Sequence, residues 1–368
     1  MKKIAIVSNT SWSLFNFRRG LARSFKSIGY EIIMVAPYDE YSQKLEEEFE
    51  YHPVYMNNKG TNPREDIKTT IAFYRLYKQI KPDIILHYTI KPNVYGTIAA
   101  SMLKIPAINN IAGLGTLFVK QSLVTKIAKV LYKYSQSKAK HIFFQNNDDH
   151  HLFISEKIVN ESKTDVLPGS GIDVTQFLPQ PKDNNDTVVF LLIARMLWEK
   201  GVGEFVEAAK IIKSKHTNVE FQLLGFLDVE NRSAISREQM QNWVDDGYVS
   251  YLGTTDNVQK FIAKADCVVL PSYYREGTPR TLLESASMAK PIITTDNVGC
   301  RDVVDHGVNG FLCQVRDAKD LAEKIDIFIA LPADERTMMG TQSRDKMIRE
   351  FDENIVIQKY NNMISTLI

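Results

Sequence analysis

The chain has 368 residues, of which 44% are hydrophobic and 24% charged, and 45 Lys+Arg against 44 Asp+Glu give a net charge of +1. This length exceeds the ~250–300 residues at which a single hydrophobic core stops growing, so the sequence predicts two domains. The composition excludes a disordered chain, a collagen and a small disulfide scaffold. The balanced charge argues against a nucleic-acid-binding protein with a wholly basic surface.

Neither cysteine spacing nor apolar runs indicate export or membrane insertion. Cys267, Cys300 and Cys313 have no zinc-type spacing and fit a reducing compartment. The apolar run at Ile4–Val7 is shorter than the ~7–15 residues of a signal-peptide core. The longest apolar stretch, Val188–Trp198, is shorter than the ~20 residues that span a bilayer. We therefore expect a cytoplasmic protein that at most lies on a membrane surface.

Short, β-branched apolar runs alternate with helical patterns along the chain. Runs of this kind, apolar on both faces, are typical of buried parallel strands joined by right-handed βαβ crossovers. The predicted strands are Ile4–Val7, Ile32–Val35, Ile84–His87, Ala107–Asn110, His141–Gln145, Val188–Ala194, Val219–Leu224, Val249–Leu252, Cys267–Leu270 and Ile292–Thr295. The predicted helices include Asn16–Ile28, Ile67–Gln79, Asn93–Leu103 and Thr125–Ser135. The fold class is therefore α/β, with parallel, doubly wound, Rossmann-like sheets.

The alternation pauses once, at Leu167–Thr187, a stretch with three prolines and a polar end. This composition is typical of a linker. We expect one domain over residues 1–170 and a second over 171–351. A helical pattern over about 352–368 is expected to pack back on the first domain.

Two glutamates with seven residues between them form the most informative motif. Glu276 and Glu284 follow the predicted strand Cys267–Leu270, and a helix is predicted to begin near Arg280. A helix N-terminus at the end of a parallel strand offers free N–H groups to an anion. A glutamate one turn into that helix can accept hydrogen bonds from a ribose diol. The alternative is an ordinary surface helix with two solvated glutamates.

A pair of cations occupies the corresponding place after the first strand of the second half. Arg195 follows the run Val188–Ala194, and Lys200 lies five residues further on. A guanidinium fork and a mobile ammonium at this position suit a diphosphate. The alternative is an ordinary basic loop.

Together these segments resemble the retaining glycosyltransferases of family 4, which have the GT-B fold of two facing Rossmann-like domains. The resemblance covers nearly the whole chain. It is carried by GIDVTQFLP (171–179), ARMLWEKGVGEFVEAA (194–209), VSYLG (249–253) and REGTPRTLLESASMAKPIITTDNVGCRDVVDHGVNGFL (275–312).

The resemblance implies roles for these residues. Arg195 and Lys200 hold the diphosphate of a nucleotide sugar. Glu276 contacts the donor sugar, and Glu284 holds the ribose. The implied catalytic residues are thus Arg195, Lys200 and Glu276, and the implied donor-binding residues are Gly253, Gly277, Thr278, Pro279, Arg280 and Glu284.

Bond breaking in a nucleotide sugar puts negative charge on the departing diphosphate, and preorganised cations stabilise that charge. The chain contains no DxD tripeptide, the common metal-binding signature of sugar transfer. We therefore expect no metal and no cofactor, the nucleotide sugar being a substrate. The run Asp148–His151 resembles a metal site, but acidic residues at a helix start explain it better.

A narrower resemblance links HYTIKPNVYGTIAA (87–100), IAGLGTLF (111–118) and VGCRDVV (298–304) to bacterial enzymes of capsule, O-antigen and N-glycan assembly. Those enzymes act on undecaprenyl-diphosphate-linked sugars. Two departures from family 4 occur in the first domain. The loop at 109–116 lacks a histidine that many members carry, and SNTSWS (8–13) replaces a glycine-rich loop.

The first half is basic, with 23 Lys+Arg and 16 Asp+Glu in residues 1–180 against 22 and 28 in the remainder. Leu123, Ile127, Leu131 and Tyr134 form one predicted helical stripe beside a lysine stripe, a pattern that suits an interfacial helix on anionic lipid. The candidate acceptor- or membrane-binding residues are Arg18, Arg19, Lys91, Lys126, Lys129 and Lys133. The alternative is an ordinary surface helix packed on the sheet.

The sequence thus predicts a retaining, metal-independent glycosyltransferase, peripheral on the inner face of the cell membrane. It would move a sugar of N-acetylhexosamine type from a UDP-sugar to a polyprenyl-diphosphate-linked acceptor in surface polysaccharide or glycan synthesis. Its partners would be the donor, the lipid-linked acceptor and an anionic membrane surface, with no nucleic acid. Two alternatives stay open. One is a UDP-sugar epimerase of GT-B fold, and the other is a two-lobed sugar-binding protein, which should carry an export signal.

Overall fold

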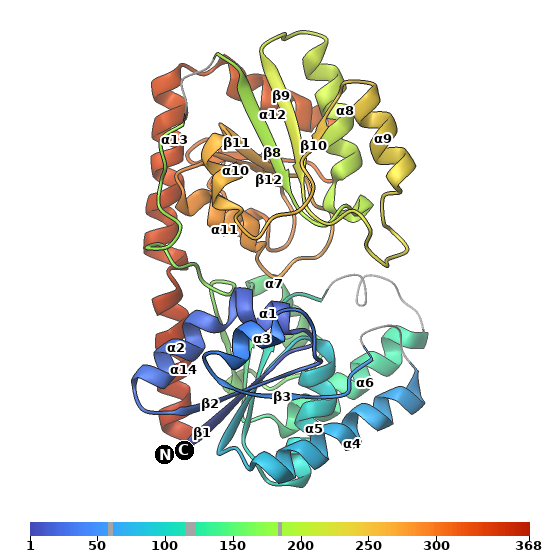
Figure 1. Ribbon diagram of the computed structural model, residues 1–368, viewed down its shortest axis with the longest axis vertical. Helices are drawn as coiled ribbons and strands as arrows, with labels where there is room; N and C mark the ends of the chain where they lie inside the picture. The colour runs from blue at the N-terminus through green and yellow to red at the C-terminus, as the bar shows by residue number, and fades with distance from the viewer. Residues whose placement is uncertain (58–61, 115–122, 183–185) are drawn as a thin grey trace. The chain divides into compact units, whose positions relative to one another are not determined.

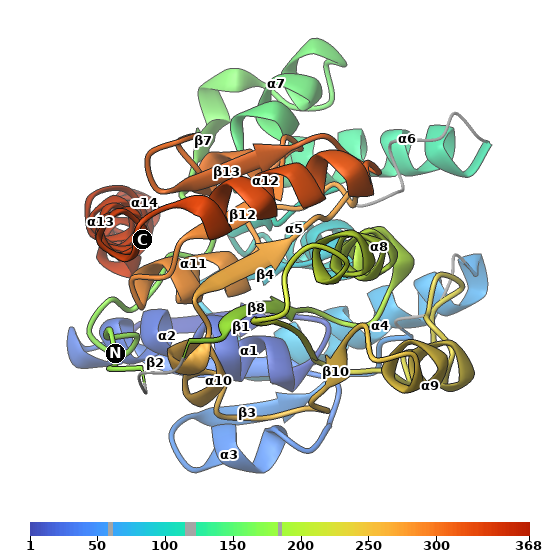
Figure 2. The ribbon, with the colours of Figure 1, turned by 90° about the horizontal axis from the view of Figure 1, so that it is seen from above.

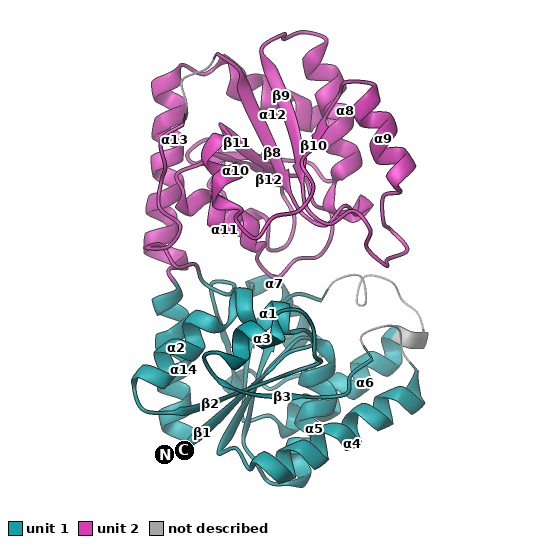
Figure 3. Ribbon diagram, viewed as in Figure 1, with its two compact units in different colours: residues 1–171, 353–368 teal, residues 172–352 magenta. Residues whose placement is uncertain are grey.

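Figure 1 shows the computed structural model, which describes residues 1–57, 62–114, 123–182 and 186–368. The chain divides into two compact units (Figure 3). Unit 1 comprises Met1–Gly171 together with Glu353–Ile368, and unit 2 comprises Ile172–Asp352. The first predicted boundary, between residues 170 and 171, differs from this division by one residue.

Unit 1 is built on a parallel sheet of seven strands in the order β3-β2-β1-β4-β5-β6-β7. Its strands are β1 (Lys3–Val7), β2 (Glu31–Ala36), β3 (Glu50–Pro53), β4 (Ile84–Tyr88), β5 (Ala107–Ile111), β6 (His141–Phe144) and β7 (Thr164–Val166). The strand order reverses between β1 and β4, and ligands of open α/β sheets bind at such a reversal.

Helices cover both faces of this sheet. They are α1 (Ser11–Phe17), α2 (Arg19–Ser27), α3 (Ser42–Glu46), α4 (Pro63–Ile80), α5 (Thr97–Met102), α6 (Leu123–Lys138), α7 (Asn147–Ser155) and α14 (Glu353–Leu367). The single helix expected over Asn16–Ile28 is two helices, because Arg18 leaves the helical region at φ −128° and ψ −5°. Helix α4 begins earlier than expected because the Asn62 side chain accepts from Arg64 N and caps it.

Alternate residues of β1 pack on opposite faces, as the period of a strand requires. Ile4 and Ile6 lie in a core cluster that includes Val356, Tyr360 and Ile364 of α14. Their neighbours Ala5 and Val7 lie in another cluster with Phe73 and Tyr77 of α4. Helix α14 therefore supplies part of the core of unit 1, although it follows unit 2 in the sequence.

Unit 2 repeats this architecture with a six-stranded parallel sheet in the order β10-β9-β8-β11-β12-β13. Its strands are β8 (Val188–Ile193), β9 (Val219–Leu224), β10 (Ser250–Tyr251), β11 (Cys267–Leu270), β12 (Ile292–Thr295) and β13 (Gly310–Cys313). The order reverses between β8 and β11, which are hydrogen-bonded neighbours.

The helices of unit 2 also lie on both faces of its sheet. They are α8 (Val202–Lys213), α9 (Arg237–Asp245), α10 (Gln259–Lys264), α11 (Arg280–Ser287), α12 (Ala318–Ala330) and α13 (Ala333–Lys346). Helices α8 and α12 lie side by side on one face (Figure 2), where Phe190 and Leu192 of β8 pack. Leu191 and Ile193 pack on the other face, in a cluster with α10 and α11. No helix within the described residues is long and apolar enough to cross a bilayer.

Candidate active site

All the predicted catalytic and donor-binding residues except Gly253 lie after β8 or β11, at the carboxyl ends of the two strands between which the strand order of unit 2 reverses. Arg195 and Lys200 follow the end of β8, and Lys200 lies in a 3₁₀ turn, Trp198–Lys200. Glu276 lies in the loop after β11, and Glu284 lies in the helix that follows. The topology thus brings two sequence-distant motifs to one edge of the sheet.

Lys200 and Glu276 form an ion pair through Lys200 Nζ and Glu276 Oε1. Their side chains are only 14% and 11% exposed, so water screens the pair weakly. Ser272 Oγ lies 2.9 Å from the same carboxylate oxygen, and the Tyr274 ring centroid lies 5.2 Å from Lys200 Nζ. Burial raises the pKa of Tyr274, which favours its neutral phenol. The Lys200 ammonium therefore lies in close contact with the Glu276 carboxylate and near the neutral Tyr274 ring.

The two loops are joined through their backbones. Glu199 O accepts hydrogen bonds from Tyr273 N and Tyr274 N, each at 3.0 Å. Gly201, at φ +77°, lies so close to Pro271 that a Cβ at this position would be 2.1 Å from the Pro271 carbonyl oxygen. Only glycine combines this φ with this approach. The Lys200 loop is therefore fixed against the Glu276 loop.

The loop after β12 supports the Glu276 loop from the other side. Asn297 Nδ2 donates to Tyr274 O at 2.9 Å and to Ser272 O at 3.3 Å. Gly299, at φ +76°, approaches Gly277 so closely that a Cβ would lie 2.1 Å from its carbonyl oxygen. The loop after β11 is thus held between the loops of both neighbouring strands.

Glu284 lies inside α11, where Arg280 Nε donates to its Oε1 at 3.1 Å. Burial raises the pKa of Glu284, and the Arg280 charge opposes that rise. Helix α11 begins at Arg280, and Pro279 before it provides no side-chain cap. Thr278, in the same turn, is 9% exposed.

Arg195 and Gly253 complete the predicted donor set. The Arg195 side chain is exposed. Gly253, at φ +74°, follows β10, and its carbonyl oxygen accepts from Gly225 N at 2.8 Å. A Cβ on Gly225 would lie 1.8 Å from Ala194 O. The loops after β8, β9 and β10 therefore form one connected edge.

The candidate residues of unit 1 fall into different environments. Arg18 is 5% exposed, and its guanidinium carbon lies 4.0 Å from the Tyr88 ring centroid. Arg18 is thus buried in unit 1 rather than part of an exposed basic surface. Arg19 pairs with Glu48 at 3.6 Å. Lys91 pairs with Asp66 at 2.8 Å, with both side chains largely shielded from solvent.

Helix α6 exposes both lysines and apolar side chains. Lys126 and Lys133 are exposed, whereas Lys129 pairs with Glu156 at 2.8 Å. Among residues 125–138 of this helix, the exposed apolar residues are Ile127 (54%), Val130 (67%) and Tyr134 (53%). Over the same residues, the buried polar side chains are Thr125, Ser135 and Gln136, and Tyr132 is buried with them. The predicted apolar stripe therefore faces outward in part; the Leu123 side chain lies outside the described residues.

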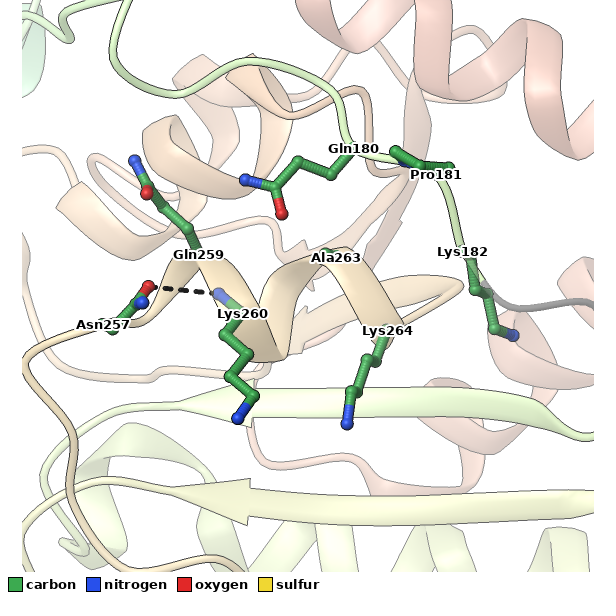
Figure 4. A pocket seen from close by; sticks show the side chains of 8 residues that line it. All are labelled: Gln180, Pro181, Lys182, Asn257, Gln259, Lys260, Ala263 and Lys264. Carbon is green, nitrogen blue, oxygen red and sulfur yellow. Dashed lines mark hydrogen bonds between the residues drawn. The ribbon is translucent and has the colours of Figure 1, made fainter.

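A pocket of about 350 Å³ lies elsewhere on unit 2 (Figure 4), and its lining residues are Gln180, Pro181, Lys182, Asn257, Gln259, Lys260, Ala263 and Lys264. Lys182 precedes β8 and forms an ion pair with Asp266, which precedes β11. The pocket is thus at the amino ends of these strands, opposite the Lys200–Glu276 pair.

Within the described part of the chain, no cluster of three or more His, Cys, Asp or Glu residues has the geometry to hold a metal ion. Asp148 and Asp149 lie in the first turn of α7, where Asp149 N donates to Asn146 Oδ1 at 2.7 Å. His150 Nε2 lies 2.8 Å from Thr164 Oγ1. Asp149 thus takes part in the start of α7, and His150 contacts β7.

The sequence did not single out Ser272, Asn297 and Gly299 as part of the site. Ser272 lies four residues before Glu276 on the same loop, and this closeness in sequence is the feature that could have pointed to it. Asn297 and Gly299 belong to a loop whose approach depends on the pairing of β11 with β12.

Comparison with known proteins agrees with this architecture. Residues 173–346 match the family described as Glycosyl transferases group 1, and residues 3–146 match Glycosyl transferase 4-like. The chain is 30% identical over 384 residues to the N,N'-diacetylbacillosaminyl-diphospho-undecaprenol alpha-1,3-N-acetylgalactosaminyltransferase of Campylobacter jejuni, covering 100% of this chain and 99% of that protein.

Solved structures share the fold across the whole chain. A glycosyltransferase from Rickettsia africae aligns with a TM-score of 0.81 at 19% identity, covering 100% of this chain and 98% of that one. The Anabaena protein HepE in complex with UDP aligns with a TM-score of 0.78 at 17% identity, covering 100% of both chains. The chain therefore belongs to the group 1, family 4 glycosyltransferases and has their GT-B fold.

Proposed function

We propose that this glycosyltransferase moves a sugar of N-acetylhexosamine type from a UDP-sugar to a polyprenyl-diphosphate-linked acceptor, with retention of anomeric configuration. The observation that carries the donor half is the buried Lys200–Glu276 pair at the strand-order reversal of unit 2. The name of the Campylobacter relative supports the lipid-linked acceptor and the N-acetylhexosamine. The UDP bound to the Anabaena structure supports the nucleotide.

The donor lies in unit 2 in this proposal. Lys200 and Arg195 stabilise the negative charge that develops on the diphosphate as the anomeric C–O bond breaks. Glu284 accepts from the ribose hydroxyls, and Glu276 accepts from a hydroxyl of the donor sugar. Because Glu276 is paired with Lys200, it serves as an acceptor of hydrogen bonds rather than as a free nucleophile. The E-x7-E pattern shared with the retaining family supports retention. No metal takes part.

Unit 1 holds the acceptor and contacts the cytoplasmic face of the membrane. Lys126 and Lys133 supply exposed positive charge on α6, and Ile127 and Val130 supply exposed apolar surface on the same helix. This combination is typical of helices at an anionic lipid surface. Lys91 is the candidate for the acceptor diphosphate, which would compete with Asp66 for its ammonium.

The direct test is transfer by purified protein, with UDP-GalNAc, UDP-GlcNAc, UDP-Gal and UDP-Glc supplied separately alongside a short-chain polyprenyl-diphosphate sugar. We expect one donor to give an extended lipid product whose new linkage keeps the α-configuration by NMR. An epimerase would instead change the UDP-sugar without acceptor, and a binding protein would bind UDP-sugar without product. A β-linked product would contradict retention of the anomeric configuration but would leave the donor and acceptor assignments standing.

A further inference from the structure

We propose that helix α4 is a second membrane-contact element of unit 1, so that an anionic lipid surface docks on a face shared by α4 and α6 rather than on α6 alone. The inference rests on the membrane contact proposed above for unit 1, and it extends that contact to a helix that the sequence did not single out for this role. The observation that carries it is the outward side of α4, where exposed cations alternate with exposed isoleucines.

The outward stripe of α4 (Pro63–Ile80) is apolar and basic at once. Its members are all exposed and fall on one side of a helix of 3.6 residues per turn: Arg64, Ile67, Lys68, Ile71, Arg75 and Lys78. Ile67 is 61% exposed and Ile71 is 44% exposed. The opposite side of the helix includes Phe73 and Tyr77, which are fully buried in the core beneath it. The core of unit 1 therefore does not account for the two outward isoleucines.

The acidic side chains of α4 are withdrawn from this stripe. Asp66 is 9% exposed and pairs with Lys91 at 2.8 Å. The Glu65 side chain is 18% exposed and pairs with Lys68 at 2.8 Å. Residues 67–80 contain no acidic residue. The outward side of α4 thus offers positive charge to a partner without an exposed carboxylate of its own helix beside it.

Helices α4 and α6 lie on the same face of the sheet, each in contact with α5 (Figure 1). Alternate residues of a strand share a face, so Ala107 and Ile111 of β5 point to the same side. Ala107 packs in the core cluster of α4, and Ile111 packs in that of α6. Helices α5 and α6 contain no Asp or Glu, and Met102 of α5 is 63% exposed. The outward sides of α4 and α6 therefore point away from the sheet in the same sense.

The other face of this sheet, covered by α2 and α3, carries charges of both signs. Arg23 and Lys26 are exposed there, as is Glu46. The Arg23 guanidinium donates to both carboxylate oxygens of Glu48, each at 2.7 Å. Mixed signs are typical of a surface that faces water. Cations with long apolar stems, interleaved with isoleucines, are instead typical of a helix at an anionic lipid surface.

The first test is sedimentation with vesicles made of equal parts of phosphatidylglycerol and phosphatidylcholine. The variant changes Arg64, Arg75 and Lys78 together to Gln, a good helix former that carries no charge. A cation near an anionic surface strengthens binding roughly fivefold, so the loss of three should weaken binding about a hundredfold. Melting temperatures of variant and wild type should be similar, because all three side chains are exposed.

The matched control changes Arg23, Lys26 and Lys44 together to Gln, which lowers the net charge by the same amount. These residues lie on α2 and α3, on the other face of the sheet. The reach of surface charge is about 10 Å at 0.1 M salt, so at this salt concentration the control should bind vesicles like the wild type. An equal loss of binding in both variants would make net charge the cause and overturn the inference.

A second test reports contact directly and does not depend on the triple variant. The three native cysteines are buried, so a polarity-sensitive fluorophore can be attached selectively to Ile71→Cys. Its emission should shift to shorter wavelength when the same vesicles are added, because this position enters the apolar layer. Labelled Lys44→Cys, on the other face, should show no shift. If the triple variant does not fold, this comparison decides.

The outcomes separate this inference from the contact on which it rests. Wild-type protein that does not sediment with the vesicles overturns both. Wild-type sedimentation that the α4 variant retains, with no shift of the label at residue 71, overturns the inference alone and leaves α6 as the contact. Equal sedimentation with vesicles of phosphatidylcholine alone contradicts the role of charge and also overturns the inference. The donor assignments are independent of these results, because UDP titration tests them separately.

Discussion

Arg280 Nε donates to Glu284 Oε1 at 3.1 Å across one turn of α11, and the two side chains are only 14% and 13% exposed. The carboxylate that we assign to the ribose is therefore already oriented by its own helix. Because a carboxylate accepts several hydrogen bonds, Glu284 can keep Arg280 and still receive a hydroxyl.

Replacing Glu284 by Gln tests that assignment. A neutral amide is a poorer acceptor, and hydrogen bonds to charged groups are worth roughly 1.5–3 kcal/mol, so UDP affinity should fall on the order of tenfold. Calorimetric titration measures the change, with Glu323→Gln on the exposed surface of α12 as control. Unaltered affinity would remove Glu284 from the ribose site.

Replacing either of the two cations assigned to the diphosphate should lower turnover, but only one of the two replacements should lower the melting temperature. Lys200→Ala and Arg195→Ala should each lower kcat at saturating donor by at least ~100-fold, the usual cost of losing one preorganised group. Lys200→Ala should also lower the melting temperature, because it leaves buried Glu276 without its ammonium partner. Arg195 is exposed, so its variant should melt like the wild type. Near-normal turnover in either variant would contradict its assigned role.

The metal-free mechanism is tested with a chelator. Excess EDTA should leave the initial rate of sugar transfer unchanged, because Lys200 and Arg195 supply the charge that a divalent ion would otherwise supply. The control is a second addition of excess Mg²⁺, which should also have no effect. A large loss restored by Mg²⁺ would show that a metal takes part.

His87 should make the stability of unit 1 depend on pH. Its ring is fully buried against Tyr77, Asn109 and Thr97, and burial lowers its pKa to about 3. Below the ordinary histidine pKa of about 6.5, the unfolded chain binds a proton at His87, whereas the buried ring of the folded protein stays neutral. The contribution of His87 therefore leaves the free energy of unfolding unchanged above pH 6.5. Below pH 6.5 it lowers that free energy by up to about 1.4 kcal/mol per pH unit.

Urea unfolding at pH 7, 6 and 5 measures this slope. His87→Gln removes the titrating ring and should flatten the slope, whereas His151→Gln, at an exposed position, should not. Equal slopes in wild type and His87→Gln would show that other groups cause the acid sensitivity.

Membrane binding is tested by changing Lys126, Lys129 and Lys133 together to Glu. Each lysine near an anionic surface contributes about 1 kcal/mol at low salt, so the triple variant should no longer sediment with anionic vesicles. Transfer to a short, water-soluble acceptor should persist. If the wild-type protein does not sediment with such vesicles at low salt, the membrane-binding role is wrong and α6 is an ordinary surface helix.

Periodicity predicts the α/β class, and the resemblance to family 4 implies the GT-B fold; both predictions are confirmed. Periodicity failed at sheet edges. Strand β3 (Glu50–Pro53) is half exposed and contains a proline, and β7 (Thr164–Val166) has three residues, so neither forms a buried apolar run. Strand β13 (Gly310–Cys313) begins at a glycine directly after a turn and was also missed.

The site shows a different limit of sequence reasoning. Motif spacing identified Lys200 and Glu276 separately, but their ion pair depends on β8 and β11 being neighbours. The contacts of Asn297 and Gly299 likewise depend on the pairing of β12 with β11. The roles of Lys200 and Glu276 in binding the donor stay predictions, which the experiments above test.

The return of α14 to unit 1 has a consequence for how the protein is made. The Tyr360 ring lies 4.7 Å from that of Phe143, and its hydroxyl accepts from Asn110 at 3.1 Å. On the ribosome, residues 1–171 emerge first but must wait for these contacts until all of residues 172–352 have been translated. The unit synthesised first is thus completed last, and a chain cut short at residue 352 would keep unit 2 whole while leaving unit 1 with an open core.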